Sequence, residues 1–197
     1  MEDFIRIWPN FVPPEVCQET IDSFESFITD PNLQDLIKDN GSQFSNGMLG
    51  RKDLALFLED PRFNKADLCT KYLYLLQDCL TEYIKDFGQL SNIALSNYRN
   101  LKIQRTMPMG GYHHWHYENG NGPKSYPREL TWMIYLNDMP EGEAETEFLF
   151  QCRRIRPTQG TVVIWPAGMT HPHRGLTVYT QPKYIATGWY HKTNQND

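Results

Sequence analysis

The amino-acid sequence predicts a mainly β protein with supporting helices at its N-terminal end. Aromatic residues make up 13% of the chain, and aromatic rings suit the half-buried faces of strands. Apolar residues recur at helical spacing before about residue 97 and at strand spacing after it. Turn-forming segments separate the strand-like stretches. A chain of 197 residues can bury a core of its own, so we expect one domain over 1–197.

The N-terminal part, 1–96, is expected to be mainly helical. Pro13 and Pro14 open the segment NFVPPEVCQETIDSFESFI, and proline is favoured in the first turn of a helix. The segment KADLCTKYLYLLQDCLTEYIKDFG carries an apolar stripe at helical spacing. Between them, 41–53 is rich in Gly, Ser and Asn and is expected to form a loop.

The C-terminal part, 97–191, is expected to consist of short strands. The strand-like segments are NLKIQRTM, ELTWMIYLND, ETEFLFQ, GTVVIWPA and KYIATGWYHK. They are rich in β-branched and aromatic residues, and segments such as DMPEGE and RPTQG separate them. This spacing of short strands predicts a β-sandwich or a barrel-like double sheet.

Charge and composition argue against several classes of partner. The formal net charge of −5 does not favour binding to nucleic acid or to an anionic membrane. No apolar run approaches the ~20 residues that span a bilayer, and MEDFIRIWPN lacks the features of a signal peptide. The four cysteines are scattered without a CxxC pair, which predicts buried thiols in a reducing compartment. We therefore expect a cytoplasmic protein.

Five of the six histidines lie in two short segments, HHWHYENG (113–120) and THPHRG (170–175). If 112–118 is extended, His114, His116 and Glu118 share one face of a strand. A single histidine of this kind is more often an ordinary half-exposed side chain. Two imidazoles and a carboxylate buried together are costly unless they are paired or bind a cation. Histidine and carboxylate ligands with open positions suit non-haem iron, whereas structural zinc favours four ligands, often thiolates.

These motifs resemble the iron- and 2-oxoglutarate-dependent oxygenases of the prolyl 4-hydroxylase type. The resemblance covers roughly 97–191 and rests on His116-Tyr117-Glu118, GTVVIWPAGMTHPHRG and PKYIATGWY. It implies a double-stranded β-helix (jelly-roll or cupin-like) core preceded by helices. It also implies Fe(II) as the cofactor and 2-oxoglutarate and molecular oxygen as co-substrates, with succinate and CO2 as products. Ascorbate is a further requirement that the resemblance implies.

The resemblance assigns His116, Glu118 and a distal histidine as iron ligands. His171 and His173 are both candidates for the distal ligand. His173 is favoured because ten residues, the usual interval in this family, separate it from Lys183. The family usually has aspartate where this chain has Glu118, which leaves the subgroup open.

Lys183 is expected to pair with the C5 carboxylate of 2-oxoglutarate. Arg174 is the rival cation, but it neighbours a ligand and points to the opposite face of an extended segment. The residues considered for further contacts with the co-substrate or the barrel interior are Tyr98, Gln104, Tyr112, Thr131 and Thr146.

The expected reaction is hydroxylation of an unactivated C–H bond. The substrate is expected to be a prolyl residue in a peptide or protein, and a free amino acid or another small molecule remains open. A groove bordered by 41–53 and 119–128 would suit a peptide, and 119–128 is either a lid or a plain surface loop.

Two other classes compete with the oxygenase. A cupin would hold a metal through His114, His116 and His171, because His-x-His and Pro166-x-Gly168-x-x-His171 are both present. Glu118 follows too soon for the cupin pattern, and a cupin gives no role to Lys183. A non-catalytic β-sandwich binding module would need no metal site.

Overall fold

The computed structural model describes residues 2–58, 62, 66–92, 94–96, 101–120, 122 and 128–192. Its helices are α1 (Pro14–Thr29), α2 (Ala66–Asp86) and the 3-10 helices η1 (Pro31–Leu36) and η3 (Gly88–Asn92). Its strands are β1 (Arg6–Trp8), β2 (Lys38–Gln43), β3 (Leu49–Phe57), β4 (Leu95–Ser96), β5 (Lys102–Thr106), β6 (Gly111–His116), β7 (Arg128–Tyr135), β8 (Thr146–Phe148), β9 (Arg153–Ile155), β10 (Val162–Pro166), β11 (His173–Gly175) and β12 (Lys183–Lys192).

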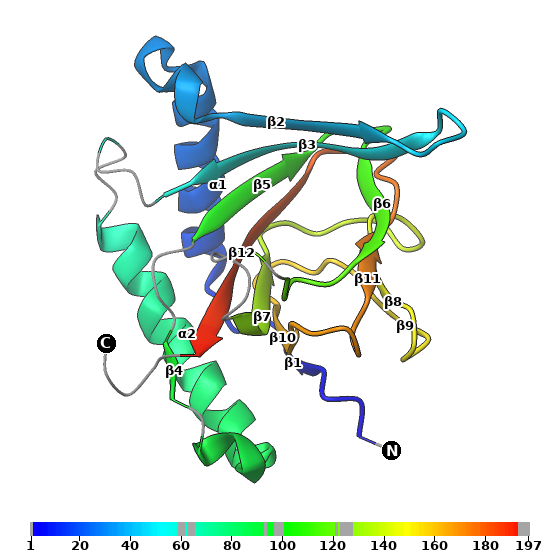
Figure 1. Ribbon diagram of the computed structural model, residues 1–197. Helices are drawn as coiled ribbons and strands as arrows, with labels where there is room; N and C mark the ends of the chain where they lie inside the picture. The colour runs from blue at the N-terminus through cyan, green and yellow to red at the C-terminus, as the bar shows by residue number, and fades with distance from the viewer. Residues whose placement is uncertain are drawn as a thin grey trace.

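All the strand pairs in the described residues are antiparallel. The main strand order is β1-β10-β7-β12-β5-β3-β6-β11-β8-β9, with β2 added to β3 and β4 added to β12. Figure 1 shows the sheet curling back so that β6, β11 and β8 face the layer that contains β5 and β12. Helices α1 and α2 lie on the outer side of that layer (Figure 1). This is the double-stranded β-helix that the sequence predicts.

Alternate residues of the central strands serve two different cores. In β10, Val162 and Ile164 belong to the cluster that includes the helices. Val163 and Trp165 belong to a second cluster inside the curled sheet. Both faces of β10 are therefore buried, which explains why its sequence is continuously apolar rather than alternating.

Both predicted helices are present, and each buries its apolar stripe. In α2, the side chains of Leu68, Tyr72, Leu76, Cys79 and Tyr83 are all at most 1% exposed. They pack in the cluster shared with the outer face of the sheet. The helices therefore support the sheet from outside and leave its inner face free for a pocket.

The prediction of a loop over 41–53 is wrong, because this segment belongs to the antiparallel hairpin of β2 and β3. Its turn is closed by hydrogen bonds from Phe44 N to Met48 O and from Gly47 N to Phe44 O. Gly47 has φ +81°, a left-handed conformation that glycine adopts without steric cost. The Asn-Gly pair at 46–47 is a typical hairpin turn. The N-terminal part thus adds four strands, β1 to β4, to the sheet.

The cysteines are free, as predicted, but only two of the four are fully buried. Cys17 and Cys79 are buried, Cys69 is half-buried, and Cys152 is exposed. No helix in the described part of the chain is long and apolar enough to cross a membrane.

Candidate metal centre and active-site pocket

Sheet pairing brings the two histidine segments together. Strand β11 pairs with β6, and His173 lies directly opposite His116 in the register. Side chains of directly opposed residues stand on the same face of a sheet. The imidazole rings of His116 and His173 accordingly lie 4.4 Å apart between centroids. Residues 57 positions apart in sequence therefore present nitrogen atoms to one point inside the curled sheet.

Glu118 completes the group from just beyond the end of β6. Its Oε1 lies 3.5 Å from His116 Nε2 and 3.7 Å from His173 Nε2. The ligand atoms of His116, Glu118 and His173 all lie within 4.8 Å of one another. Within the described residues, this is the one group of three or more such side chains with the spacing of a metal site.

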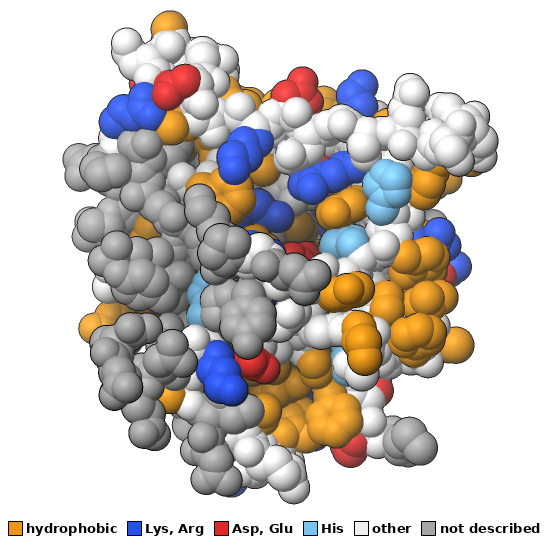
Figure 2. Space-filling model, in the orientation of Figure 1, with side chains coloured by type: hydrophobic (Ala, Val, Ile, Leu, Met, Phe, Trp, Pro, Cys, Tyr) orange, Lys and Arg blue, Asp and Glu red, His pale blue; other side chains and the backbone are white. Residues whose placement is uncertain are grey.

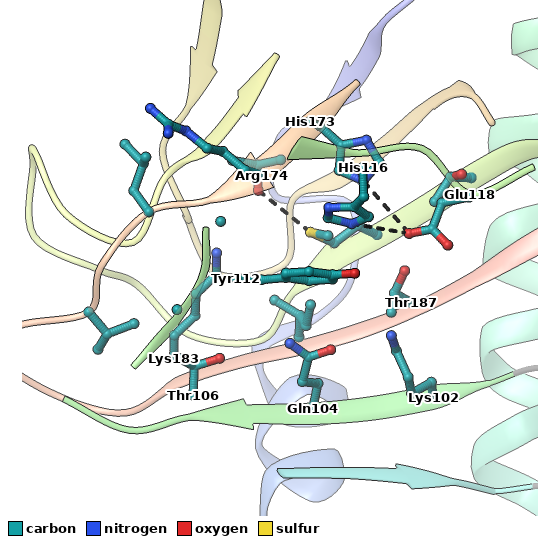
Figure 3. A pocket seen from close by; sticks show the side chains of 18 of the residues that line it. Lys102, Gln104, Thr106, Tyr112, His116, Glu118, His173, Arg174, Lys183 and Thr187 are labelled. Carbon is teal, nitrogen blue, oxygen red and sulfur yellow. Dashed lines mark hydrogen bonds and ion pairs between the residues drawn. The ribbon is translucent and has the colours of Figure 1, made fainter. Parts of the chain in front are cut away.

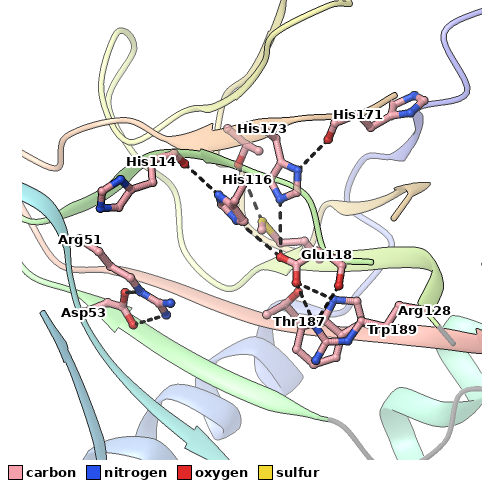
Figure 4. A network of polar contacts seen from close by, with 12 residues as sticks. Arg51, Asp53, His114, His116, Glu118, Arg128, His171, His173, Thr187 and Trp189 are labelled. Atoms are coloured by element: carbon pink, nitrogen blue, oxygen red, sulfur yellow. Dashed lines mark hydrogen bonds and ion pairs between the residues drawn. The ribbon is translucent and has the colours of Figure 1, made fainter. Parts of the chain in front are cut away.

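Backbone carbonyls fix the orientation of both imidazoles. His116 Nδ1 lies 2.9 Å from the carbonyl oxygen of His114, and His173 Nδ1 lies 3.0 Å from that of His171. A carbonyl oxygen only accepts, so each Nδ1 carries the proton and each Nε2 presents a lone pair. Figure 4 shows both rings directed at the Glu118 carboxylate. This is the tautomer and orientation that metal-binding histidines adopt when a backbone carbonyl holds the other nitrogen.

The second oxygen of the Glu118 carboxylate is held from the other side. Glu118 Oε2 accepts hydrogen bonds from Trp189 Nε1 at 3.1 Å and from Arg128 NH1 at 3.2 Å. The Arg128 guanidinium also lies 3.5 Å from the centroid of the Trp189 ring. These contacts direct Oε1 toward the imidazoles (Figure 4). Burial opposes ionisation of Glu118, but its contacts with the His116 and His173 imidazoles hold its pKa well below the usual range.

The triad lies at the wall of a pocket inside the curled sheet (Figure 3). Strand β5 contributes Lys102, Gln104 and Thr106 to the lining, and β12 contributes Lys183 and Thr187. These residues alternate along their strands, so each set lies on one face. Ile103 and Ala186, the residues between them, pack in the core on the helix side.

Lys183 is a buried cation on this wall. It is 7% exposed, and its Nζ donates a hydrogen bond to the carbonyl oxygen of Ala144 at 2.5 Å. Burial lowers the pKa of Lys183 to about 7, and the charge of Glu145 only partly opposes this shift. No carboxylate of the described residues forms an ion pair with Lys183. An anion that entered the pocket would therefore find an uncompensated ammonium.

The other expected pocket residues are also on its wall. Gln104 is 7% exposed and lines the pocket. The Tyr112 ring stacks on the His116 ring at 3.8 Å between centroids. Thr131 and Thr146 line the pocket as well, and Tyr98 lies outside the described residues.

The geometry separates the rival candidates from the triad. His171 Nε2 lies 2.8 Å from the carbonyl oxygen of Asp3, and His114 Nε2 lies 3.0 Å from Ser42 Oγ. The His114, His116 and His171 set of the cupin reading is thus not brought together. The guanidinium of Arg174 is paired with Glu147 at 2.6 Å and lies over the Trp115 ring.

The pocket fits iron and a small diacid by the chemistry of its donors. Two neutral imidazoles and one carboxylate suit Fe(II) with positions left open. Two further polar atoms that line this pocket, Trp165 Nε1 and Thr131 Oγ1, are buried without a hydrogen-bond partner in the described residues. Buried polar atoms without a hydrogen-bond partner are rare because they destabilise the fold, so these two atoms indicate that the pocket binds a polar ligand.

Sequence reasoning missed three polar neighbours of the triad: Arg128, Trp189 and Lys102. Arg128 and Trp189 come from β7 and β12, which are neighbours in the sheet. No local pattern in the sequence marks them, because their relation to Glu118 depends on the pairing of strands far apart along the chain.

A double-stranded β-helix that holds a His-Glu-His group inside its curled sheet defines a class of metal-dependent oxygenases. The comparisons agree: residues 101–191 match the 2OG-Fe(II) oxygenase superfamily. This stretch contains the His-Glu-His group and is similar to 2-oxoglutarate- and iron(II)-dependent oxygenases. No curated protein matches the chain.

Solved structures show how widely this fold is shared. A viral collagen prolyl hydroxylase from Paramecium bursaria Chlorella virus-1, in a 2OG complex, has a TM-score of 0.69 at 18% identity, covering 96% of this chain and 97% of its own. A Pseudomonas putida prolyl-4-hydroxylase gives 0.67 at 16% identity, with 98% and 94% covered. A Trichoplax adhaerens prolyl hydroxylase, in complex with a peptide fragment of hypoxia inducible factor, gives 0.69 at 17% identity, with 96% and 84% covered. At these identities the likeness establishes the fold.

Proposed function

We propose that this protein hydroxylates a prolyl residue in a peptide or protein. The reaction consumes 2-oxoglutarate and molecular oxygen and releases succinate and CO2. The observation that carries this proposal is the convergence of His116 Nε2, His173 Nε2 and Glu118 Oε1 in a pocket that also holds the buried cation Lys183. The prolyl substrate is suggested by the names of the solved structures that share the fold.

One set of pocket residues would bind the metal, and another set would bind the co-substrate. His116, Glu118 and His173 would hold Fe(II) and leave positions open for a chelating 2-oxo acid and oxygen. When bound, the iron supplies the oxidative chemistry. Lys183 would attract the far carboxylate of 2-oxoglutarate, since a buried ammonium and a carboxylate form a strong charge-assisted hydrogen bond. Gln104 and Tyr112, on the same wall, would give further polar contacts to the co-substrate.

The peptide would approach along the face below the β2–β3 hairpin. Figure 2 shows this face hollowed, with Lys and Arg side chains gathered beneath the hairpin. The hairpin contacts the metal-binding strand directly, because the Phe44 ring lies 4.3 Å from the His114 ring between centroids. This hairpin replaces the loop 41–53 as one border of the substrate groove, and 119–128, in part outside the described residues, is the other proposed border.

The test is succinate release from 2-oxoglutarate with Fe(II), combined with mass spectrometry of proline-containing peptides. We expect a mass gain of one oxygen on proline and one succinate for each hydroxylation. His173→Ala should abolish both signals, and His114→Ala should retain them. Succinate release that no proline peptide stimulates would refute the prolyl assignment and leave the oxygenase assignment intact.

Two further expectations belong to the same proposal. We place the protein in the cytoplasm, which agrees with its free cysteines, and expect no nucleic-acid or membrane partner. Ascorbate would keep the iron reduced during turnover without peptide. Omitting ascorbate should then shorten the active lifetime of the enzyme without changing its initial rate.

A further inference from the structure

The pocket has a second cation at the end opposite Lys183. In the antiparallel pairing of β5 and β12, Lys183 faces Thr106 and Lys102 faces Thr187. A four-residue offset along a strand separates the two lysine positions by about 14 Å. Figure 3 shows Lys102 pointing from β5 into the pocket below Glu118, with Lys183 at the far end of the same row. A small diacid held at Lys183 and the metal therefore leaves Lys102 free.

Lys102 is unpaired within the described residues. The structure gives its ammonium no hydrogen bond or ion pair there, and its Nζ lies 5.6 Å from the centroid of the Trp189 ring. Burial also lowers the pKa of Lys102. A half-buried ammonium is costly to keep without a counter-charge, so its place in the pocket calls for an anionic or strongly accepting ligand group.

The carboxylates around Lys102 are already engaged. Glu118 presents Oε1 to the two imidazoles and Oε2 to Arg128 and Trp189. Asp53 binds Arg51 through both oxygens, at 2.6 and 3.1 Å, and also accepts from Asn40. Metal binding would engage Glu118 further. Neither carboxylate is therefore available as a dedicated partner.

We infer that Lys102 forms a subsite for a carboxylate of the substrate, close to the proline that is hydroxylated. This inference rests on the proposed function and narrows its substrate class to acidic prolyl substrates. The carboxylate comes from one of two sources: the α-carboxylate of a C-terminal or free proline, or the side chain of an adjacent Asp or Glu. Gln104 lies on β5, at a position between Lys102 and the Thr106 position that faces Lys183 on β12. It therefore separates this subsite from that of the co-substrate.

The test compares acids with their neutral amides on Fe(II)- and 2-oxoglutarate-loaded protein under nitrogen, by calorimetry. One pair is N-acetyl-glycyl-proline and its carboxamide. The other is N-acetyl-Gly-Pro-Glu-amide and N-acetyl-Gly-Pro-Gln-amide. We expect the acid of at least one pair to bind about tenfold to a hundredfold more tightly than its amide, since a charged partner strengthens a hydrogen bond. The pair that shows the preference identifies the source.

Matched variants assign the preference to Lys102. Lys102→Met should remove it while leaving the affinity for the amides within about twofold, and Lys102→Arg should retain it. Lys52→Met is the control, because Lys52 is exposed on β3 and should leave the preference unchanged. The preference should also weaken as salt is raised. Circular dichroism and thermal unfolding verify that each variant is folded.

The outcomes separate this inference from the proposed function. Equal binding of acids and amides, or a preference that survives Lys102→Met, would overturn the inference. If hydroxyproline forms in air from acids and amides at equal rates, the inference fails and the proposed function stands. If Lys102 confers a preference for acids but no proline is hydroxylated, the subsite stands and the prolyl assignment fails.

Discussion

The pH dependence of 2-oxoglutarate binding gives a direct test of Lys183. Burial lowers the pKa of Lys183 to about 7 in the free protein, so this ammonium is losing its proton near neutral pH. The carboxylate of 2-oxoglutarate would favour the charged form and raise the pKa in the complex. Binding therefore takes up a proton above neutral pH. The affinity for 2-oxoglutarate should be highest below the pKa of Lys183 in the free protein, and it should fall as the pH rises above that pKa.

The magnitude follows from the fraction of protein that carries charged Lys183. With a pKa of about 7, this fraction falls about 25-fold between about pH 6.5 and about pH 8.5, and the apparent Kd should rise by the same factor. The affinity stops falling only when the pH exceeds the pKa of Lys183 in the complex. A lysine with its ordinary pKa of ~10.4 would give no change over this range.

The assay is a titration of the iron-saturated protein with 2-oxoglutarate under nitrogen, followed by the visible charge-transfer band. Lys183→Arg is the matched control, because a guanidinium keeps its charge throughout this range. Its binding curve should be flat with pH, apart from any effect that the metal ligands contribute to both proteins. An equal slope in the wild type and in Lys183→Arg would refute the role of Lys183.

Three other perturbations test the site and its support. His173→Ala should abolish Fe(II) binding and His114→Ala should preserve it, as measured by metal analysis after gel filtration; the reverse result would favour the cupin ligand set. Arg128→Met should weaken Fe(II) binding about tenfold to hundredfold, because orienting partners of metal ligands have effects of this size; unchanged affinity by calorimetry would contradict it. Leu76→Ala should lower the free energy of unfolding in urea by about 2–5 kcal/mol, because Leu76 is 1% exposed. Leu73→Ala, at a position 46% exposed, should have a much smaller effect, and equal losses would show that α2 does not pack as described.

Local periodicity was sufficient for α1 and α2 and for five strands of the C-terminal part, β5, β7, β8, β10 and β12, but it did not mark the short strands β9 and β11. The apolar stripe of α2 and the short runs that became β5, β7 and β10 are strong signals, because burial itself requires them. The β2–β3 hairpin was missed for an opposite reason. Strand β2 is almost wholly exposed, so it carries little apolar pattern, and only its Asn-Gly turn marks it.

The candidate ligand set was also within reach of the sequence, but the side chains that surround it were not. The interval to Lys183 favoured His173 over His171, and the structure brings His173 into the group while His171 holds the carbonyl oxygen of Asp3. Arg128 and Lys102 had no signal of this kind. Their positions follow from the register of β7, β12 and β5, which is a property of the assembled sheet.

The glutamate at position 118 can be understood from the backbone around it. Strand β6 ends at His116, and the N–H groups of Glu118 and Asn119 both donate to the carbonyl oxygen of Ala167 at 2.9 Å. The carboxylate therefore reaches the imidazoles from a turn rather than from a strand position. The same side chain must also meet Arg128 and Trp189, which lie on its other side. An aspartate is one methylene shorter, so it could not keep both sets of contacts without moving this turn. Glu118 therefore depends on both Arg128 and Trp189 for its orientation. The need for glutamate at this position follows from the hydrogen bonds that fix the turn to Ala167.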